Sequence, residues 1–266
     1  MFKTSKVIIL LTMITAVILL AGGCNKDDNN KPTTSYNLKV KDVLGVSGKV
    51  TFTETSSTTT TIDIALTNAP AGSHPANLYQ SSAVEDGAVI QILNPVDESG
   101  KSSTVVNMAY SQLLPYDGCV RIMNSSSETH VIVAQGDIGG NVITATNKTY
   151  TLNTVGIYGV SGTALFEKRE NNNTLVTITL TGTITGDLYP VSINMGSIAS
   201  VGGGPVMKAL NDVDGTTGKS YTNVRTLNTG IAVTYDNWLV YDGYINIYQS
   251  PMALGVIISH GNIGSN

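Results

Sequence analysis

The sequence contains one block of residues twice, and this duplication limits the fold more than any other feature. The matching segments are Tyr36–Leu38 with Tyr150–Leu152, Gly45–Gly48 with Gly159–Gly162, and Val131–Gly139 with Val256–Gly264. The offset between them grows from 114 to 125 positions, so the insertions fall between these segments, in loops. Each copy has roughly 110 residues, a common size for a domain. The duplication therefore predicts two domains of the same fold in tandem.

Apolar residues alternate with polar residues within each copy. Ile62, Ile64 and Leu66 do so in the first copy, and Val176 and Ile178 in the second. A period of two is typical of half-buried strands, and clusters of Gly, Asn, Asp and Ser predict turns between them. Seven or eight short strands in each copy predict an all-β chain of two tandem Greek-key β-sandwich domains of immunoglobulin-like type. The predicted boundaries are residues 36–140 for the first domain, 141–149 for a linker and 150–266 for the second domain.

The N-terminus has the pattern of a signal peptide over residues 1–23. Two lysines precede the apolar run from Val7 to Leu20, which is short for a membrane span, and small residues then precede Cys24. This ending resembles the bacterial lipobox, in which cleavage occurs before the Cys and its thiol carries diacylglycerol. Ordinary signal cleavage, which would leave Cys24 as a free thiol, is the alternative.

The segment 24–35 is polar and predicts a flexible tether. Lys26-Asp27-Asp28 resembles the acidic export signal of Bacteroidota surface lipoproteins, although a solvated linker explains the same residues. We therefore expect a lipid-anchored protein of the outer membrane, exposed at the cell surface. The formal net charge of −4 and the lack of a Lys/Arg-rich run argue against nucleic acid as a partner.

Both copies share an order of motifs that resembles the chordin-type (CHRD) domain and its relative, copper/zinc superoxide dismutase. The order is Gly-Val-Ser-Gly, an alternating strand, the turn at 66–75, a variable middle, and the ending at 133–139. The resemblance covers both copies, about 230 residues of the chain. It implies a Greek-key β-sandwich of the superoxide-dismutase type, in agreement with the strand pattern.

The dismutase binds copper and zinc through six His and one Asp, whereas this whole chain has three His. The positions that match copper-binding His are Asn77, Tyr79 and Met123 in the first copy and Ser192, Asn194 and Tyr248 in the second. The resemblance therefore implies that the ligands are lost, and we expect no metal, no cofactor and no catalytic activity. The alternative is a divergent metal-binding enzyme in which Asn77, Tyr79 and Met123 are ligands.

Aromatic residues near the end of the second copy form a candidate ligand-binding patch. Tyr241, Tyr244 and Tyr248 are expected to point outward from one strand, with Trp238 just upstream. Tyr and Trp on an outer sheet face suit recognition of a glycan or a protein, because each offers a flat apolar body with a polar tip. Ordinary cover of a strand, or burial between the two copies, is the alternative.

Two further residues are predicted to have no functional role. His74 follows a turn and is expected to be exposed, and Cys119 is expected to be an unpaired thiol without a catalytic His. The sequence thus predicts a non-catalytic binding or structural module, with a glycan-binding accessory lipoprotein as a further alternative. It leaves the oligomeric state open.

Overall fold

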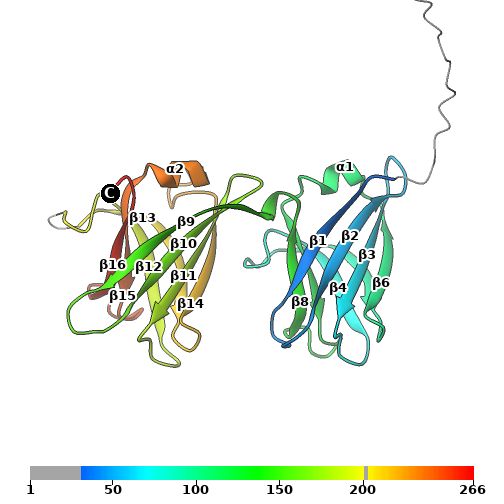
Figure 1. Ribbon diagram of the computed structural model, residues 1–266, viewed down its shortest axis with the longest axis horizontal. Helices are drawn as coiled ribbons and strands as arrows, with labels where there is room; N and C mark the ends of the chain where they lie inside the picture. Colours follow the sequence, from blue (N-terminus) through cyan, green and yellow to red (C-terminus); the bar gives the residue numbers. More distant parts are fainter. Residues whose placement is uncertain (1–30, 201–202) are drawn as a thin grey trace, which may run out of the picture. The chain divides into compact units, whose positions relative to one another are not determined.

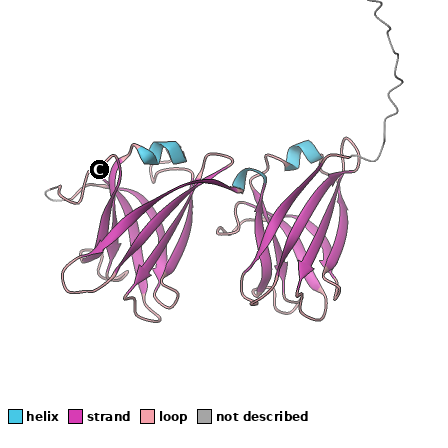
Figure 2. Ribbon diagram, viewed as in Figure 1, coloured by secondary structure: helices cyan, strands magenta, loops and turns pink. Residues whose placement is uncertain are grey.

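The computed structural model describes residues 31–200 and 203–266, and almost all of them belong to strands and the turns between strands. Pro32–Asn266 forms one compact unit that contains two eight-stranded sheets (Figure 1). Helix in the described residues is limited to three short segments (Figure 2). The prediction of an all-β fold is therefore confirmed. Cys24, the signal peptide and most of the expected tether lie outside the described residues.

The first sheet contains the strands β1 (Thr33–Val40), β2 (Ser47–Glu54), β3 (Thr60–Thr67), β4 (His74–Gln80), β5 (Val89–Val96), β6 (Lys101–Val106), β7 (Gly118–Met123) and β8 (Ile132–Ile138). Their order is β5-β4-β7-β8-β1-β2-β3-β6. Helix α1 (Tyr110–Leu113) precedes β7. The edge strands β5 and β6 are joined by a tight turn and contact each other, so the sheet curls into a barrel-like form.

The second sheet contains the strands β9 (Ile143–Thr154), β10 (Ser161–Arg169), β11 (Thr174–Thr181), β12 (Leu188–Met195), β13 (Val206–Asp214), β14 (Lys219–Val224), β15 (Asp242–Tyr248) and β16 (Ile257–Gly264). Their order, β10-β11-β14-β13-β12-β15-β16-β9, closes into a barrel. Helix α2 (Tyr235–Leu239) precedes β15. Numbered from its own first strand, this sheet has the same neighbours as the first, so the two copies share one topology. We call the sheets the first and the second barrel.

Each barrel has its own apolar core, formed by the inward-facing residues of the alternating strands. The two cores also repeat a specific contact. The rings of Tyr36 and Phe52 meet edge to face at 5.5 Å, and those of Tyr150 and Phe166 do so at 5.3 Å. Both cores lie wholly within the compact unit Pro32–Asn266.

The expected linker at 141–149 is wrong for most of its length. Residues 143–149 belong to β9, where Asn147 pairs with Glu167 of β10 and Thr149 pairs with Leu165. The segment is polar because it faces outward, and its threonines are β-branched residues that favour strands. The connection between the barrels is therefore short, and consists of the 3₁₀ turn Gly139–Asn141 and Val142. The first barrel also begins at Thr33 rather than at residue 36.

Candidate functional site: the polar junction between the barrels

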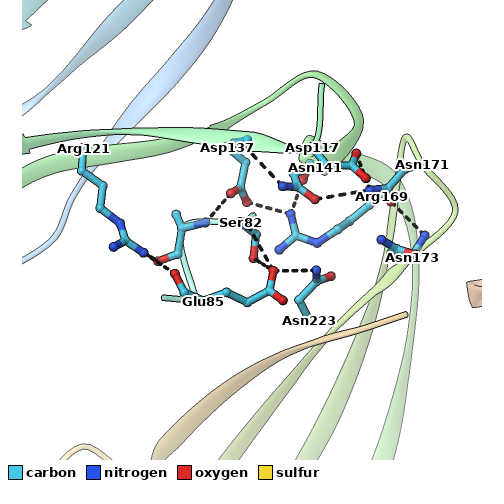
Figure 3. A network of polar contacts seen from close by, with 12 residues as sticks. Ser82, Glu85, Asp117, Arg121, Asp137, Asn141, Arg169, Asn171, Asn173 and Asn223 are labelled. Atoms are coloured by element: carbon cyan, nitrogen blue, oxygen red, sulfur yellow. Dashed lines mark hydrogen bonds and ion pairs between the residues drawn. The ribbon is translucent and has the colours of Figure 1, made fainter. Parts of the chain in front are cut away.

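A buried ion pair joins the two barrels (Figure 3). Arg169, the last residue of β10, is fully buried, and its Nη1 donates to Oδ2 of Asp137 in β8 at 2.7 Å. The same nitrogen donates to the carbonyl of Asn141 in the connecting turn. A buried guanidinium is costly unless a carboxylate balances its charge. Asp137 thus supplies the charge that allows the second barrel to place Arg169 against the first.

Glu85 forms a second group of contacts at this junction. It lies in the loop after β4, and its Oε2 accepts hydrogen bonds from the Ser82 amide at 3.1 Å and from Nδ2 of Asn223 in β14 at 2.8 Å. Its Oε1 lies 3.5 Å from a guanidinium nitrogen of Arg225. Burial raises the pKa of Glu85, but the hydrogen bonds and the charge of Arg225 outweigh burial and hold the pKa below its ordinary value. These contacts therefore favour the ionised form of Glu85.

The loop that carries Glu85 is itself fixed by the first barrel. Nη2 of Arg121 in β7 donates to the carbonyls of Ala83 and Glu85, at 3.3 and 2.5 Å. The amide of Ala83 donates to Oδ1 of Asp137 at 2.6 Å. Arg121 also lies over the ring of Tyr79, 4.9 Å from its centre. These contacts position the loop, so Glu85 is presented to the second barrel in one conformation.

The second copy shows which of these contacts belong to the fold and which to the junction. Asn262 takes the place of Asp137 and accepts a hydrogen bond from the equivalent loop amide at 2.9 Å. Ser200 takes the place of Glu85 and accepts from the equivalent Ser amide at 3.1 Å. Anchoring of the loop is thus common to both copies, whereas the two carboxylates occur only in the first. Their negative charges balance cations of the second barrel: Asp137 pairs with Arg169, and Glu85 lies beside Arg225.

The expected outward-facing aromatic patch is wrong for its largest member. Trp238 lies in α2 and is fully buried in the core of the second barrel, against the ring of Phe166 at 6.1 Å. Tyr241 packs edge to face on Trp238, with the ring centres 5.0 Å apart. The helix, which the period-two pattern does not predict, turns the ring of Trp238 inward, and Tyr241, just after the helix, packs against it. They contribute to stability rather than to a binding surface.

The two remaining tyrosines of the patch lie on β15. Tyr244 is 4% exposed, because the loop after β12 covers it and the amide of Gly204 donates to its hydroxyl at 2.8 Å. Its expected exposure is therefore also wrong. Tyr248 is half-buried, and its hydroxyl lies 2.9 Å from that of Ser192. Trp238, Tyr241, Tyr244 and Tyr248 therefore do not form a flat exposed face for a ligand.

The three residues of the first barrel that the sequence resemblance aligns with copper ligands lie together. Nδ2 of Asn77 donates to the hydroxyl of Tyr79 at 3.3 Å, and that hydroxyl lies 3.9 Å from the sulfur of Met123. In the second barrel Nδ2 of Asn194 donates to the hydroxyl of Ser192 at 2.9 Å. Over residues 31–200 and 203–266, no group of three or more His, Cys, Asp or Glu is arranged to hold a metal ion.

The expectation of an exposed His74 is wrong. It is the first residue of β4, it is 1% exposed, and its ring nitrogens lie 2.7 Å from the Asn124 carbonyl and 2.9 Å from the Pro70 carbonyl. His74 thus joins two turns of the first barrel. Cys119 is a buried free thiol, and burial raises its pKa to about 12. A thiol with this pKa is not a nucleophile at neutral pH.

The sequence analysis did not predict the junction, although the differences between the two copies contain a signal for it.

Comparison with known proteins returned no matching family model, no matching curated protein and no matching solved structure. None of the helices in the described part of the chain is long and apolar enough to cross a membrane. The polar junction is therefore the best-defined candidate site that the molecule itself offers.

Proposed function

We propose that this chain is a lipid-anchored protein of the cell envelope, exposed on the outer membrane, that acts as a non-catalytic binding or structural module. The sequence pattern that ends at Cys24 supports the anchor, and the buried pair of Arg169 and Asp137 is the observation that supports a structural module. In a catalytic site, charged side chains point at the substrate. Here the charged side chains of Asp137 and Arg169 instead bond to each other across the two copies of one fold. A surface module that presents or spaces other groups benefits from such a fixed pair of domains, because relative domain motion is the default without it.

We further infer that each barrel is a metal-free, CHRD-like Greek-key domain. The strand order supports this inference, because β3 pairs with β6, β4 pairs with β5, and the edge strands β5 and β6 contact each other through their tight turn. The same relation links β11 with β14 in the second copy. Positions that match dismutase ligands carry side chains that bond to one another, as Ser192 and Asn194 do.

Lipid attachment is tested by labelling growing cells with an alkyne analogue of palmitate. We expect the label on the wild-type chain and on Cys119→Ser, and its loss in Cys24→Ser. Cys119 is the matched control because the chain has only two cysteines. Protease treatment of intact cells should then digest the labelled chain. A wild-type chain that carries no label, or a Cys24→Ser variant that keeps it, would contradict the anchor.

The alternative, a divergent metal-binding enzyme, has one observation in its favour, the proximity of Asn77, Tyr79 and Met123. Mass spectrometry of residues 32–266, purified without chelator and then offered copper and zinc, separates the two proposals. We expect less than a tenth of an equivalent of either metal. A near-stoichiometric amount that is lost in Asn77→Ala/Met123→Ala would favour the enzyme. The glycan-binding alternative has lost its support, because Trp238 and Tyr244 are buried.

A further inference from the structure

Apolar side chains are exposed at one end of the second barrel, where the loops between β9 and β10, β11 and β12, and β15 and β16 emerge (Figure 1). They are Ile157, Tyr158, Ile184, Leu188, Met252 and Leu254. Ile157 and Met252 are 98% and 96% exposed, so both protrude from the surface. We call these six residues the apolar end. Contiguous exposed apolar surface on a folded domain marks a site of interaction.

Contacts between the three loops hold the apolar end together. The amide of Val155, before Ile157, donates to the carbonyl of Ile258 at 2.9 Å, which joins the first loop to the start of β16. On the other side a Cβ added at Gly182 would lie 2.5 Å from the carbonyl oxygen of Gly159. The loop between β9 and β10 therefore touches both of its neighbours. The apolar residues lie on adjacent loops rather than at separate places on the barrel.

The first barrel provides an internal comparison, because the same loops of the same topology are polar there. Residues 155–160, 182–187 and 249–256 of the second barrel contain one charged residue, Asp187. The matching loops of the first barrel contain Lys41, Asp42 and Glu128, and the large apolar side chains exposed there within the described residues are Leu44 and, at the end of β1, Val40. The topology does not require apolar residues at this end. They are a property of the second copy alone.

We propose that the apolar end of the second barrel inserts into the interface of a lipid bilayer. Protein interfaces surround their apolar centre with a polar rim that forms hydrogen bonds. At this end the charged residues Asp187, Asp214 and Lys219 lie in or beside the loops β11–β12 and β13–β14, whereas the loops that carry Ile157 and Met252 have no charge. Protruding side chains on separate loop tips fit a fluid acyl boundary without needing a complementary surface. The proposal rests on the proposed function, because the lipid anchor would keep the chain beside a membrane.

The loops also limit how deeply the apolar end can insert. Loop amides and carbonyls need water or headgroups as partners, so the backbone stays outside the hydrocarbon region. Only the tips, such as Ile157 and Met252, reach the acyl boundary. Tyr158 has an apolar ring and a polar hydroxyl, which suits the depth of the headgroups.

The test uses flotation of residues 32–266, which lack the anchor and contain both cores, with phosphatidylethanolamine/phosphatidylglycerol vesicles. We expect the wild-type unit to float with the vesicles and Ile157→Ser/Met252→Ser to show a partition coefficient about a hundredfold lower, since each of the two apolar side chains removed costs about one order of magnitude. Leu44→Ser is the matched control on the equivalent loop of the first barrel and should change partition less than twofold. Fluorescence of Trp238 should confirm that every variant is folded.

Three outcomes would overturn the proposal: a wild-type unit that stays at the bottom of the gradient, a double variant that floats as well as the wild type, or a Leu44→Ser variant that loses binding equally. Sedimentation of the wild-type unit without lipid tests whether a second copy of the chain binds the apolar end instead. Self-association that Ile157→Ser/Met252→Ser abolishes, with no flotation, would identify the apolar end as a contact between copies instead. Because this unit has no Cys24, flotation fails or succeeds independently of palmitate labelling.

Discussion

Replacing Asp137 with Asn should destabilise the protein strongly although it changes one atom. The new side chain would still offer its carbonyl oxygen to the amide of Ala83, as Asn262 does for the equivalent amide in the second barrel. It would leave the fully buried guanidinium of Arg169 without a counter-charge. Removing one partner of a buried pair costs about 3–5 kcal/mol, and since 16% of the Asp137 side chain is exposed, we expect about 3 kcal/mol. The melting temperature should fall by about 6–12 °C.

The assay is urea unfolding followed by fluorescence, because Trp238 is the single tryptophan and lies in the core of the second barrel. Asp63→Asn, an exposed change of the same kind in β3, should shift the unfolding free energy by less than about 0.5 kcal/mol. Arg169→Met should remove most of the cost of Asp137→Asn, which gives a coupling of about 2 kcal/mol in a double-mutant cycle. A cost below about 1 kcal/mol, or the same cost in both backgrounds, would refute the reasoning.

Three further predictions concern single side chains. The lowered pKa of Glu85 makes its stabilising effect complete above about pH 5 and lost as the pH falls through its folded-state value, so urea midpoints of wild type and Glu85→Gln should differ at pH 7 and converge near pH 2. His74→Leu should cost about 3 kcal/mol, measured by thermal unfolding, because the carbonyls of Pro70 and Asn124 lose their partner; a loss below about 1 kcal/mol would contradict this role. Cys119 should not react with a thiol reagent at pH 8 until the protein unfolds, and rapid reaction of the folded chain would show that the thiol is accessible.

The all-β fold could be predicted because its signals are local or repeated. Alternation at Ile62 and Ile64 depends only on the strand's two faces, and both side chains lie in the core. The duplication then assigned one fold to both copies without any knowledge of strand pairing. The linker failed because polar threonines in β9 suit a solvated segment and an exposed strand equally well, and only the partner strand β10 decides between them.

The aromatic residues show where alternation stops being informative. In β15, Ile245 and Ile247 lie in the core and Tyr244 points to the other face, as a period of two predicts. A period of two does not say whether a loop covers that outer face, and the loop reaching Gly204 does so. The burial of Tyr244 therefore depends on residues 40 positions away in the sequence. Local pattern alone could not have supplied that contact.

The junction depends on differences between the copies rather than on their likeness. Aligned by the repeat, Asp137 stands opposite Asn262, Glu85 opposite Ser200 and Arg169 opposite Thr55. Each pair differs in charge, and all three charged members lie where the barrels meet. Comparing the copies position by position would have singled out these residues, but not their pairing, because 32 positions separate Asp137 from Arg169.

The same comparison explains why the two copies are not interchangeable. The first barrel carries the two carboxylates, Asp137 and Glu85, and the second carries the buried Arg169, so each face of the junction is complete only with the other. If another copy of the second barrel followed the present one, its buried Arg would face Asn262 and Ser200. Neither residue has a charge to balance a buried guanidinium. The junction therefore forms in one order only, with the carboxylates of the first barrel against Arg169 of the second. Its two halves then differ at their free surfaces, where the second barrel alone exposes Ile157 and Met252.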